Sequence, residues 1–478
     1  MSTSSTTTKK VTIQDKITQH REAFLSKPFP GFGHALKEHF GFDADYVQVN
    51  NGSFGACPNY VMEIYKEWLY ESERQPDQFL RVESQAYLLE ARTALSKVVG
   101  CGVEDLVLVP NATHGVNAVL RGLNGTWAHR DAILVFNTIY GACGKAVQYM
   151  VDSNPEMDLQ VIHVTMQYPL SHAEFLNITR QTIEEAQAKG IRIKIAVLDA
   201  ISSLPGVVVP WVEVCSMLKE HQILSLVDGA HAVGQIPLNL SESDPDFFIS
   251  NCHKWLSCHR GVAFLYAPKR TQHLVPGIPT SHNYVSPNLP KPTGPALVPN
   301  SAPSEFVAMW EWTGTKDLGN ELTIPAALEF REWMGGESAI LQYNSTLAFQ
   351  AGKLVAQRLG NGSLVMETPN TTSAQDEDED EKNRLTAAMV NVSIPLPEST
   401  PQDQLPFLAA KIQKHLMQTF PTFAPFYVHN GKVWTRLSAQ VWLQIEDFEW
   451  VADRILDTLK ALDLVPDSSS KDDEKTAN

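Results

Sequence analysis

Two ionisable residues of the sequence stand just after apolar runs that are predicted to be buried strands. Asp228 follows the run Ile223–Val227 directly, and Lys254 comes shortly after the run Phe247–Ser250. A buried carboxylate is unfavourable unless a cation pairs with it, and a protonated heterocyclic nitrogen would be such a cation. Burial lowers the pKa of a lysine, so Lys254 could act as an amine nucleophile. Taken alone, Lys254 could equally be a structural lysine whose amine reaches solvent.

Three further segments place small, hydroxyl or aromatic side chains after apolar runs. The segment Pro110–Asn117 leads into a helical pattern, and free N–H groups at the start of that helix would bind a phosphate. The alternative is that Thr113 is an ordinary N-cap. Tyr140 could lay its ring on a flat cofactor or transfer a proton, or it could be a structural tyrosine. Ser202 and Ser203 could contact a ligand oxygen or cap a turn.

The combination is more informative than its members. Open α/β sheets bind ligands at the carboxyl ends of their strands, where all these residues are expected. A phosphate site, a stacking ring, an acid and an amine are what pyridoxal phosphate requires. The lysine holds the cofactor aldehyde as a Schiff base, and the acid keeps the ring nitrogen protonated, so that the ring withdraws electrons from the substrate Cα. The sequence therefore predicts a pyridoxal phosphate site.

The elements that position these residues follow from the pattern between residues 86 and 270. Short runs rich in β-branched residues alternate with helical periods such as that of Val116, Val119, Leu120 and Leu123. Such alternation predicts an α/β fold with a mostly parallel sheet covered on both faces. The predicted strands are Leu106–Val109, Ala132–Phe136, Gln160–Val164, Ile193–Leu198, Ile223–Val227, Phe247–Ser250 and Val262–Tyr266.

We expect a large cofactor-binding α/β domain over residues 81–310, a smaller α+β domain over 311–465, and an N-terminal helical segment, 1–80, that packs across both. Residues 271–320, rich in proline and serine, are predicted to form a long loop. In the smaller domain the predicted strands are Ala388–Ile394 and Lys432–Ser438, and the predicted helices are Leu322–Trp333, Leu341–Leu359, Leu405–Phe420 and Phe448–Leu462.

Two segments have the composition of disordered chain, an acidic loop over 375–382 and a tail over 466–478. They hold a large part of the charge of −16 that 38 Lys and Arg leave against 54 Asp and Glu. An acidic chain argues against a general nucleic-acid binder, which needs a basic face.

Several other features bound the class of protein. The 43% apolar and 19% charged residues are typical of a globular protein, and no apolar run is long enough to span a membrane. The six cysteines show no CxxC spacing, and the N-terminus lacks the apolar stretch of a signal peptide. We therefore expect reduced thiols and a cytoplasmic protein. Cys252, His253, Cys258 and His259 lack zinc-ligand spacing, so no metal site is expected.

Over about residues 45–460 the chain resembles the class V aminotransferase superfamily of fold-type I pyridoxal phosphate enzymes. The resemblance implies a large, mostly parallel seven-stranded sheet domain and a smaller C-terminal α+β domain. The matching motifs are Asn51-Gly-Ser-Phe-Gly, Asn111-Ala-Thr-His-Gly-Val-Asn, Thr138-Ile-Tyr-Gly-Ala-Cys-Gly-Lys, Asp228-Gly-Ala-His, Ser250-Asn-Cys-His-Lys-Trp, Thr313-Gly-Thr and Arg436-Leu-Ser-Ala-Gln.

The resemblance also implies a role for each residue of these motifs. Lys254 resembles the Schiff-base lysine and Asp228 the partner of the ring nitrogen. Thr315 resembles a residue that reaches the phosphate of the other subunit, which implies a homodimer with shared active sites. The remaining implied contacts are His231 and Ser203 near the ring oxygen O3′, Ala112, Thr113 and His253 at the phosphate, Tyr140 over the ring, Arg436 at the substrate α-carboxylate, and Asn51 and Ser53 at the substrate.

Within the superfamily the chain resembles fungal hercynylcysteine sulfoxide lyases, which are isopenicillin-N-epimerase-like. This similarity implies a C–S lyase that acts on a small S-substituted cysteine or a cysteine sulfoxide and releases a thiol or sulfenate, pyruvate and ammonia. One candidate substrate is hercynylcysteine sulfoxide of ergothioneine biosynthesis. Tyr140 or Cys143 could protonate the leaving sulfur. No cysteine follows Cys258, so the mobile-loop nucleophile of cysteine desulfurases is missing.

Two alternatives remain open from the sequence. One keeps the cofactor and changes the reaction to that of an epimerase, an aminotransferase or a decarboxylative, C–C bond-forming enzyme of fungal secondary metabolism. The other is a binding protein without catalysis, which the presence of Lys254 disfavours.

Overall fold

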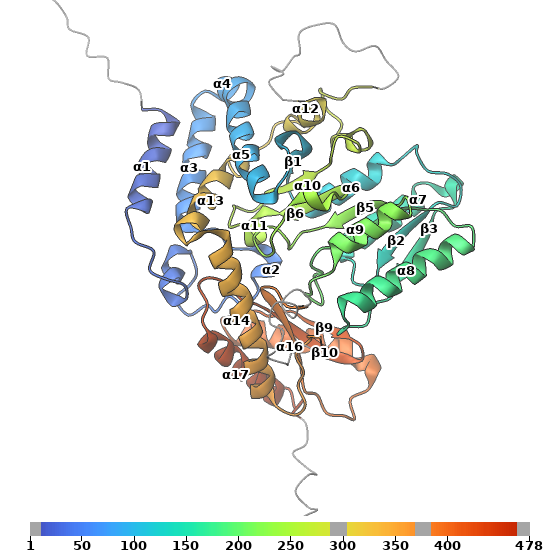
Figure 1. Cartoon of the computed structure of the whole chain (residues 1–478). Helices are drawn as coiled ribbons and strands as arrows, with labels where there is room; N and C mark the ends of the chain where they lie inside the picture. The colour runs from blue at the N-terminus through green and yellow to red at the C-terminus, as the bar shows by residue number, and fades with distance from the viewer. Residues whose placement is uncertain (1–10, 287–303, 369–383, 466–478) are drawn as a thin grey trace, which may run out of the picture.

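The computed structural model of the chain describes residues 11–286, 304–368 and 384–465. The predicted acidic loop, 375–382, and the predicted tail, 466–478, lie outside these residues. Two sheets organise the described chain, a seven-stranded sheet flanked by helices and a three-stranded antiparallel sheet near the C-terminus (Figure 1).

The seven-stranded sheet confirms the fold class and the seven strands expected from the sequence. Its strand order is β1-β7-β6-β5-β4-β2-β3. The strands from β3 across to β6 pair in parallel, and β7 runs antiparallel to both β1 and β6. The strands are β1 (Leu106–Val109), β2 (Ala132–Phe136), β3 (Gln160–Val164), β4 (Ile193–Asp199), β5 (Leu224–Asp228), β6 (Phe247–Asn251) and β7 (Ala263–Tyr266).

Continuous apolar runs form these strands because both faces of the sheet are covered. Leu106 and Leu108 of β1 pack into one apolar core, whereas Val107 and Val109 pack into another on the opposite face. Alternate side chains of a strand point to opposite faces, so a sheet covered on both sides needs apolar residues at every position. The helices that follow successive strands are α6 (Ala112–Gly122), α7 (Gly141–Asp152), α8 (His172–Ala188) and α9 (Trp211–Glu220).

Helices from the N-terminal part pack beside the large sheet (Figure 1). Helix α3 contacts both α1 and α13, and α5 contacts α13 and β1. The short helix α2 contacts α11, which follows β6. The bounds are α1 (Ile13–Leu25), α2 (Asn51–Phe54), α3 (Asn59–Arg74), α4 (Pro76–Gln78), α5 (Ser84–Val99), α10 (Leu240–Ser243), α11 (Cys252–Trp255) and α13 (Ile324–Trp333).

The smaller sheet has the order β8-β10-β9 and is antiparallel throughout. Its strands are β8 (Met389–Ser393), β9 (Phe426–His429) and β10 (Lys432–Ser438), and its neighbouring helices are α14 (Gly336–Leu359), α16 (Leu405–Thr419) and α17 (Ile445–Ala461). Two of these strands were predicted, but β9 was not. Only four residues long, β9 has just one buried side chain, so it shows little of the apolar pattern of a strand.

In the described part of 271–320, the prediction of a loop is wrong where α12 (Glu305–Glu311) and a short 3-10 helix (Gln272–Leu274) form. Ser304 caps α12 by accepting a hydrogen bond from the N–H of Val307 at 3.3 Å. Phe306 and Trp310 are buried on one side of α12, which contacts β1. Among the residues described, no helix is both long and apolar enough to cross a membrane.

Candidate active site

A cavity of about 300 Å³ lies where β4, β5 and β6 end and α6 begins. This is the edge of the sheet at which the sequence predicts a cofactor site. Most of the predicted site residues line it. The lining residues are Ser53, Phe54, Asn111, Ala112, Thr113, Tyr140, Asp199, Ile201, Ser203, Asp228, Ala230, His231, Asn251, His253 and Lys254.

Lys254 extends into this cavity from α11. Its backbone oxygen accepts a hydrogen bond from Asn51 Nδ2 at 2.9 Å, and its Nζ lies 3.2 Å from His231 Nε2. Burial, together with the nearby charge of Arg436, lowers the pKa of Lys254 to about 8, although Asp228 opposes the shift. The amine is therefore much more readily deprotonated than an exposed lysine, as a nucleophile or base requires.

Two carboxylates end neighbouring strands and face each other in register, Asp199 on β4 and Asp228 on β5. Asp228 Oδ1 accepts from the N–H of Ala230 at 3.0 Å, and Oδ2 accepts from the thiol of Cys143 at 3.2 Å. Burial and the charge of Asp228 raise the pKa of Asp199 well above its usual range. Asp228 is thus the acid that accepts hydrogen bonds, while the raised pKa of Asp199 favours its protonated form.

Tyr140 and Cys143, both considered as proton donors, occupy different environments. Tyr140 lines the cavity at the start of α7 and is 49% exposed. Cys143 is fully buried and its thiol is engaged by Asp228, and burial raises the pKa of this thiol far above its ordinary value. Tyr140 is therefore the one of the two that can meet a ligand in the cavity.

The residue that caps the start of α6 is not Thr113, which the sequence analysis considered as the N-cap. The N-cap is Asn111, whose Oδ1 accepts from the N–H of His114 at 2.9 Å, so the assignment of Thr113 as N-cap is wrong. The N–H of Ala112 donates to Asn251 Oδ1 at 2.9 Å. Side chains thus cap two of the first three N–H groups of α6, and the third belongs to Thr113, which lines the cavity.

His253 lines the cavity as a neutral ring. Its Nδ1 lies 2.9 Å from the backbone oxygen of Val262, so Nδ1 carries the hydrogen and Nε2 has only a lone pair. Burial lowers the pKa of His253 to about 4. The ring becomes a donor to an anion only when it is protonated, which a nearby phosphate favours.

Arg436 lies on β10 behind the cavity wall and is 2% exposed. Its Nη1 donates to the backbone oxygen of Ser203 at 2.7 Å, and its Nη2 donates to Asn50 Oδ1 at 3.0 Å and to Ser53 Oγ at 3.3 Å. These partners are neutral, and burial lowers the pKa of Arg436 to about 10. The guanidinium is therefore held in place by groups that leave its charge uncompensated.

Asn51 and Ser53 belong to α2, which packs closely against α11. Gly55 ends α2 at φ +65°, and a Cβ at this position would overlap the backbone oxygen of His253. Glycine is therefore required here for both its backbone angle and its size. The close contact places Ser53 in the cavity wall and Asn51 behind Lys254.

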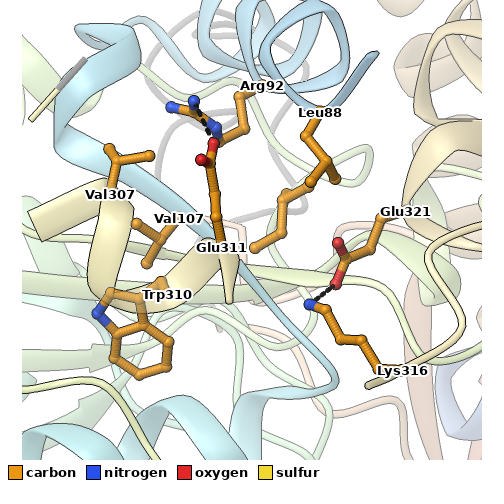
Figure 2. Close-up of a pocket in the computed structure, with 9 residues that line it drawn as sticks. Leu88, Arg92, Val107, Val307, Trp310, Glu311, Lys316 and Glu321 are labelled. Atoms are coloured by element: carbon orange, nitrogen blue, oxygen red, sulfur yellow. Dashed lines mark hydrogen bonds and ion pairs between the residues drawn. The ribbon is translucent and has the colours of Figure 1, made fainter. Parts of the chain in front are cut away.

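Thr315 is exposed and is not among the residues that line the cavity. In the sequence it lies between Glu311, which pairs with Arg92, and Lys316, which pairs with Glu321; Figure 2 shows both ion pairs. The structure therefore fixes both sides of the segment that carries Thr315 while leaving Thr315 itself at the surface.

Sequence reasoning missed Asp199, the second acid of the site, and the strand register that explains its position. Asp199 stands opposite Asp228, but the sequence drew attention only to the hydroxyls that follow Asp199. A second acid at the end of a buried run is the signal that could have found it. In the described part of the chain, no three His, Cys, Asp or Glu side chains gather as a metal site would require.

Comparison with known proteins agrees with this geometry. The family model "Aminotransferase class-V" matches residues 56–351. The chain is 32% identical to the L-cysteine desulfhydrase-like protein lolT2 of Epichloe uncinata, over 90% of this chain and 94% of that protein. It is 30% identical to hercynylcysteine sulfoxide lyase of Schizosaccharomyces pombe, over 89% of this chain and 97% of the lyase.

A solved structure of the protein C-DES, with glycine covalently linked to its pyridoxal phosphate cofactor, superimposes with a TM-score of 0.66 at 19% identity. The match covers 88% of this chain and 99% of C-DES. This likeness confirms the predicted fold class.

Proposed function

The chain belongs to the class-V aminotransferase family, and from this premise we propose that it is a pyridoxal phosphate-dependent C–S lyase. Its substrate would be an S-substituted cysteine or a cysteine sulfoxide, because relatives include a cysteine desulfhydrase-like protein and hercynylcysteine sulfoxide lyase. Hercynylcysteine sulfoxide is therefore the first substrate to test.

The observation that carries the proposal is that two basic groups, the amine of Lys254 and the guanidinium of Arg436, adjoin one cavity without an acidic partner. Within the residues that the structure describes, neither Lys254 nor Arg436 forms an ion pair with a carboxylate. A buried charge without a partner is unfavourable unless a ligand supplies the partner. A cofactor aldehyde at Lys254 and a substrate carboxylate at Arg436 would meet both requirements.

The other residues of the cavity fit the same cofactor. Asp228 would hold the protonated ring nitrogen, and Asp199, being neutral, would add no second negative charge there. Tyr140 would cover one face of the ring. The phosphate would bind at the start of α6 through Thr113, with Ala112 in the cavity wall and His253 protonated, and His231 and Ser203 would contact the ring oxygen.

When bound, pyridoxal phosphate withdraws electrons from the substrate Cα and so stabilises negative charge there. Arg436 would hold the α-carboxylate with its planar guanidinium, next to Ser53 and with Asn51 nearby. Lys254, once its amine is free, would take the Cα proton as general base, for which its lowered pKa suits it. Tyr140 would give a proton to the sulfur as the Cβ–S bond breaks and the electron pair leaves with sulfur.

The products follow from the loss of the Cα proton and the cleavage of the Cβ–S bond. The leaving group is a thiol, or a sulfenic acid when the substrate is a sulfoxide. The remaining fragment is 2-aminoacrylate, which water converts to pyruvate and ammonia.

We also propose a cytoplasmic homodimer in which Thr315 contacts the phosphate in the other subunit's site, because Thr315 lies outside this chain's own cavity.

The test is pyruvate release by the protein loaded with pyridoxal phosphate, from a series of cysteine S-conjugates and their sulfoxides. The expected result is equal amounts of pyruvate and ammonia, with strong loss in Tyr140→Phe. A protein that binds the cofactor but releases no pyruvate from any of them would overturn the lyase proposal. Deuterium from solvent at Cα without pyruvate would instead identify an epimerase or aminotransferase.

A further inference from the structure

Trp255 directly follows Lys254 in the sequence. The side chain of Trp255 makes one polar contact, with His231. Its indole Nε1 lies 3.3 Å from Nδ1 of His231, and both side chains are buried. An indole N–H can only donate a hydrogen bond. Nδ1 of His231 is therefore the acceptor and carries no hydrogen.

The other nitrogen of His231 must then carry the proton. Burial, with Lys254 and Arg436 nearby, lowers the pKa of His231 well below its ordinary value, so the ring is neutral. A neutral imidazole has one N–H, and the contact with Trp255 assigns it to Nε2. This Nε2 lies 3.2 Å from Lys254 Nζ. An N–H at that distance finds an acceptor only in the unprotonated amine, because an ammonium has no lone pair.

We propose that Trp255 is a positioning residue: it holds His231 as the Nε2–H tautomer, which makes His231 a permanent donor toward Lys254 and stabilises the unprotonated lysine. The proposal rests on the proposed function only in taking Lys254 as the reactive amine. It assigns to Trp255 a role that its apolar packing alone would not give.

Further hydrogen bonds hold the backbones of both Trp255 and His231. The backbone oxygen of Trp255 accepts from Arg331 Nη1 at 2.7 Å, and Arg331 is in turn paired with Glu337. The backbone oxygen of His231 accepts from Gln235 Nε2 at 2.7 Å. These bonds fix the backbones that carry the two rings, and the indole itself is held by close packing, because Trp255 is fully buried.

Charged and titratable groups from four other elements also act on Lys254, so the test must separate their effect from that of His231. Arg436 from the smaller sheet lowers the pKa of Lys254, whereas the acids and the thiol raise it. These groups are Arg436 on β10, Asp228 on β5, Asp199 on β4 and Cys143 on α7. None of them contacts Trp255 through a hydrogen bond in the described residues, so a Trp255 variant leaves them in place.

The test measures the pKa of Lys254 in the full chain freed of cofactor, in Trp255→Phe and in a matched control. Trp442→Phe is the control, because Trp442 is also buried but its Nε1 has no partner among the described residues. The readout is the pH dependence of acetylation of Lys254 by acetic anhydride, followed by mass spectrometry. This readout needs no lyase activity, so its outcome is separate from that of the pyruvate test.

Without the indole N–H, the Nδ1–H tautomer of His231 becomes available, and its Nε2 can accept from the lysine ammonium. The pKa of Lys254 should then rise by about one unit in Trp255→Phe, the effect of one hydrogen bond, and should not move in Trp442→Phe. Equal pKa values in Trp255→Phe, Trp442→Phe and the unchanged protein would overturn the proposal.

A second pair of variants tests the same point without altering Trp255. In His231→Gln, the amide oxygen can accept from Trp255 while the amide N–H₂ donates to Lys254. The pKa of Lys254 should stay near the wild-type value there and rise in His231→Leu, which has no donor. An equal rise in both variants would contradict the assignment of His231 as a donor. Adding Trp255→Phe to His231→Leu should change the pKa no further, and an additive rise would mean that Trp255 acts independently of His231.

Discussion

Two buried groups of charges in this protein are built in opposite ways. At the end of α12, Arg92 lies 2.9 Å from Glu311, and Lys316 lies 2.6 Å from Glu321. We call these four residues the α12 charge cluster. The cavity that they help to line has a volume of only about 10 Å³ (Figure 2). Each charge has its partner, and there is room for about one water molecule.

The cavity at Lys254 shows the reverse arrangement. It has a volume of about 300 Å³, in the range of small-molecule sites. In the parts of the chain that the structure describes, Lys254 and Arg436 have hydrogen-bond partners but no carboxylate within ion-pair distance. Paired buried charges beside little space serve the fold, whereas uncompensated charges beside a large space await a ligand. The following variants test that contrast.

Lys254→Ala should have the largest effect. Pyruvate formation should fall on the order of 10⁴-fold, because the variant loses both the amine for the cofactor and the base. The free energy of unfolding of the cofactor-free chain at pH 7 should not fall, since a buried amine with a lowered pKa opposes folding. Steady-state kinetics and urea unfolding measure the two effects. Lys254→Arg should be equally inactive, and an active arginine variant would contradict the account, because a guanidinium is not deprotonated.

Arg436→Leu should lower kcat/KM by about 10²-fold, mainly through a higher KM, because the substrate carboxylate loses a charge-assisted partner. Absorbance titration with pyridoxal phosphate should show unchanged cofactor uptake, since Arg436 is placed at the substrate and not at the cofactor. Arg436→Lys keeps the charge without the planar fork and should recover part of the activity. A variant with normal KM would remove Arg436 from the substrate site.

Arg92→Leu should instead act on stability, because it leaves Glu311 buried without its partner. The expected loss is about 3 kcal/mol in the free energy of unfolding, measured by urea denaturation. Kinetic constants per folded molecule should change little. The double variant Arg92→Leu/Glu311→Leu should regain most of the stability, since an apolar pair tolerates burial. Equal instability of the single and double variants would show that the pair's role is not mutual neutralisation.

The change that is smallest per pH unit is a pH dependence of stability in the cofactor-free chain. Lys254 has a pKa of about 8 when folded and an ordinary value of 10.5. Between these values the unfolded chain binds more protons, so this residue makes stability rise with pH, by up to about 1.4 kcal/mol per unit. Lys254→Ala should lack this rise over the same pH window. Parallel curves for the two proteins would show that Lys254 titrates normally.

Much of the large sheet could be predicted because its strands are short apolar runs that end at polar residues. The predicted run Ile223–Val227 differs from β5 by one residue at each end, and Asp228 proves to be the last residue of the strand. A continuous apolar run is itself the signature of a strand buried on both faces. The residues that follow such runs were therefore recognisable as site residues before their positions were known.

The contacts that define the site chemistry could not be predicted, because they join residues without any fixed spacing. The facing of Asp199 and Asp228 depends on strand register, and the hydrogen bond between Trp255 and His231 joins a helix to the segment that follows β5. The pair of Arg92 and Glu311 spans 219 residues. Periodicity reports which face of an element is buried, and it carries no information on which polar side chains meet there.

The most direct test of the account is to find where the cofactor attaches. The full chain loaded with pyridoxal phosphate is reduced with borohydride, digested and examined by peptide mass spectrometry. The account predicts one modified site, Lys254, and no modification at the paired Lys316. A pyridoxyl group on another lysine, or a loaded chain with Lys254 unmodified, would contradict the claim that the uncompensated charges around Lys254 form the active site.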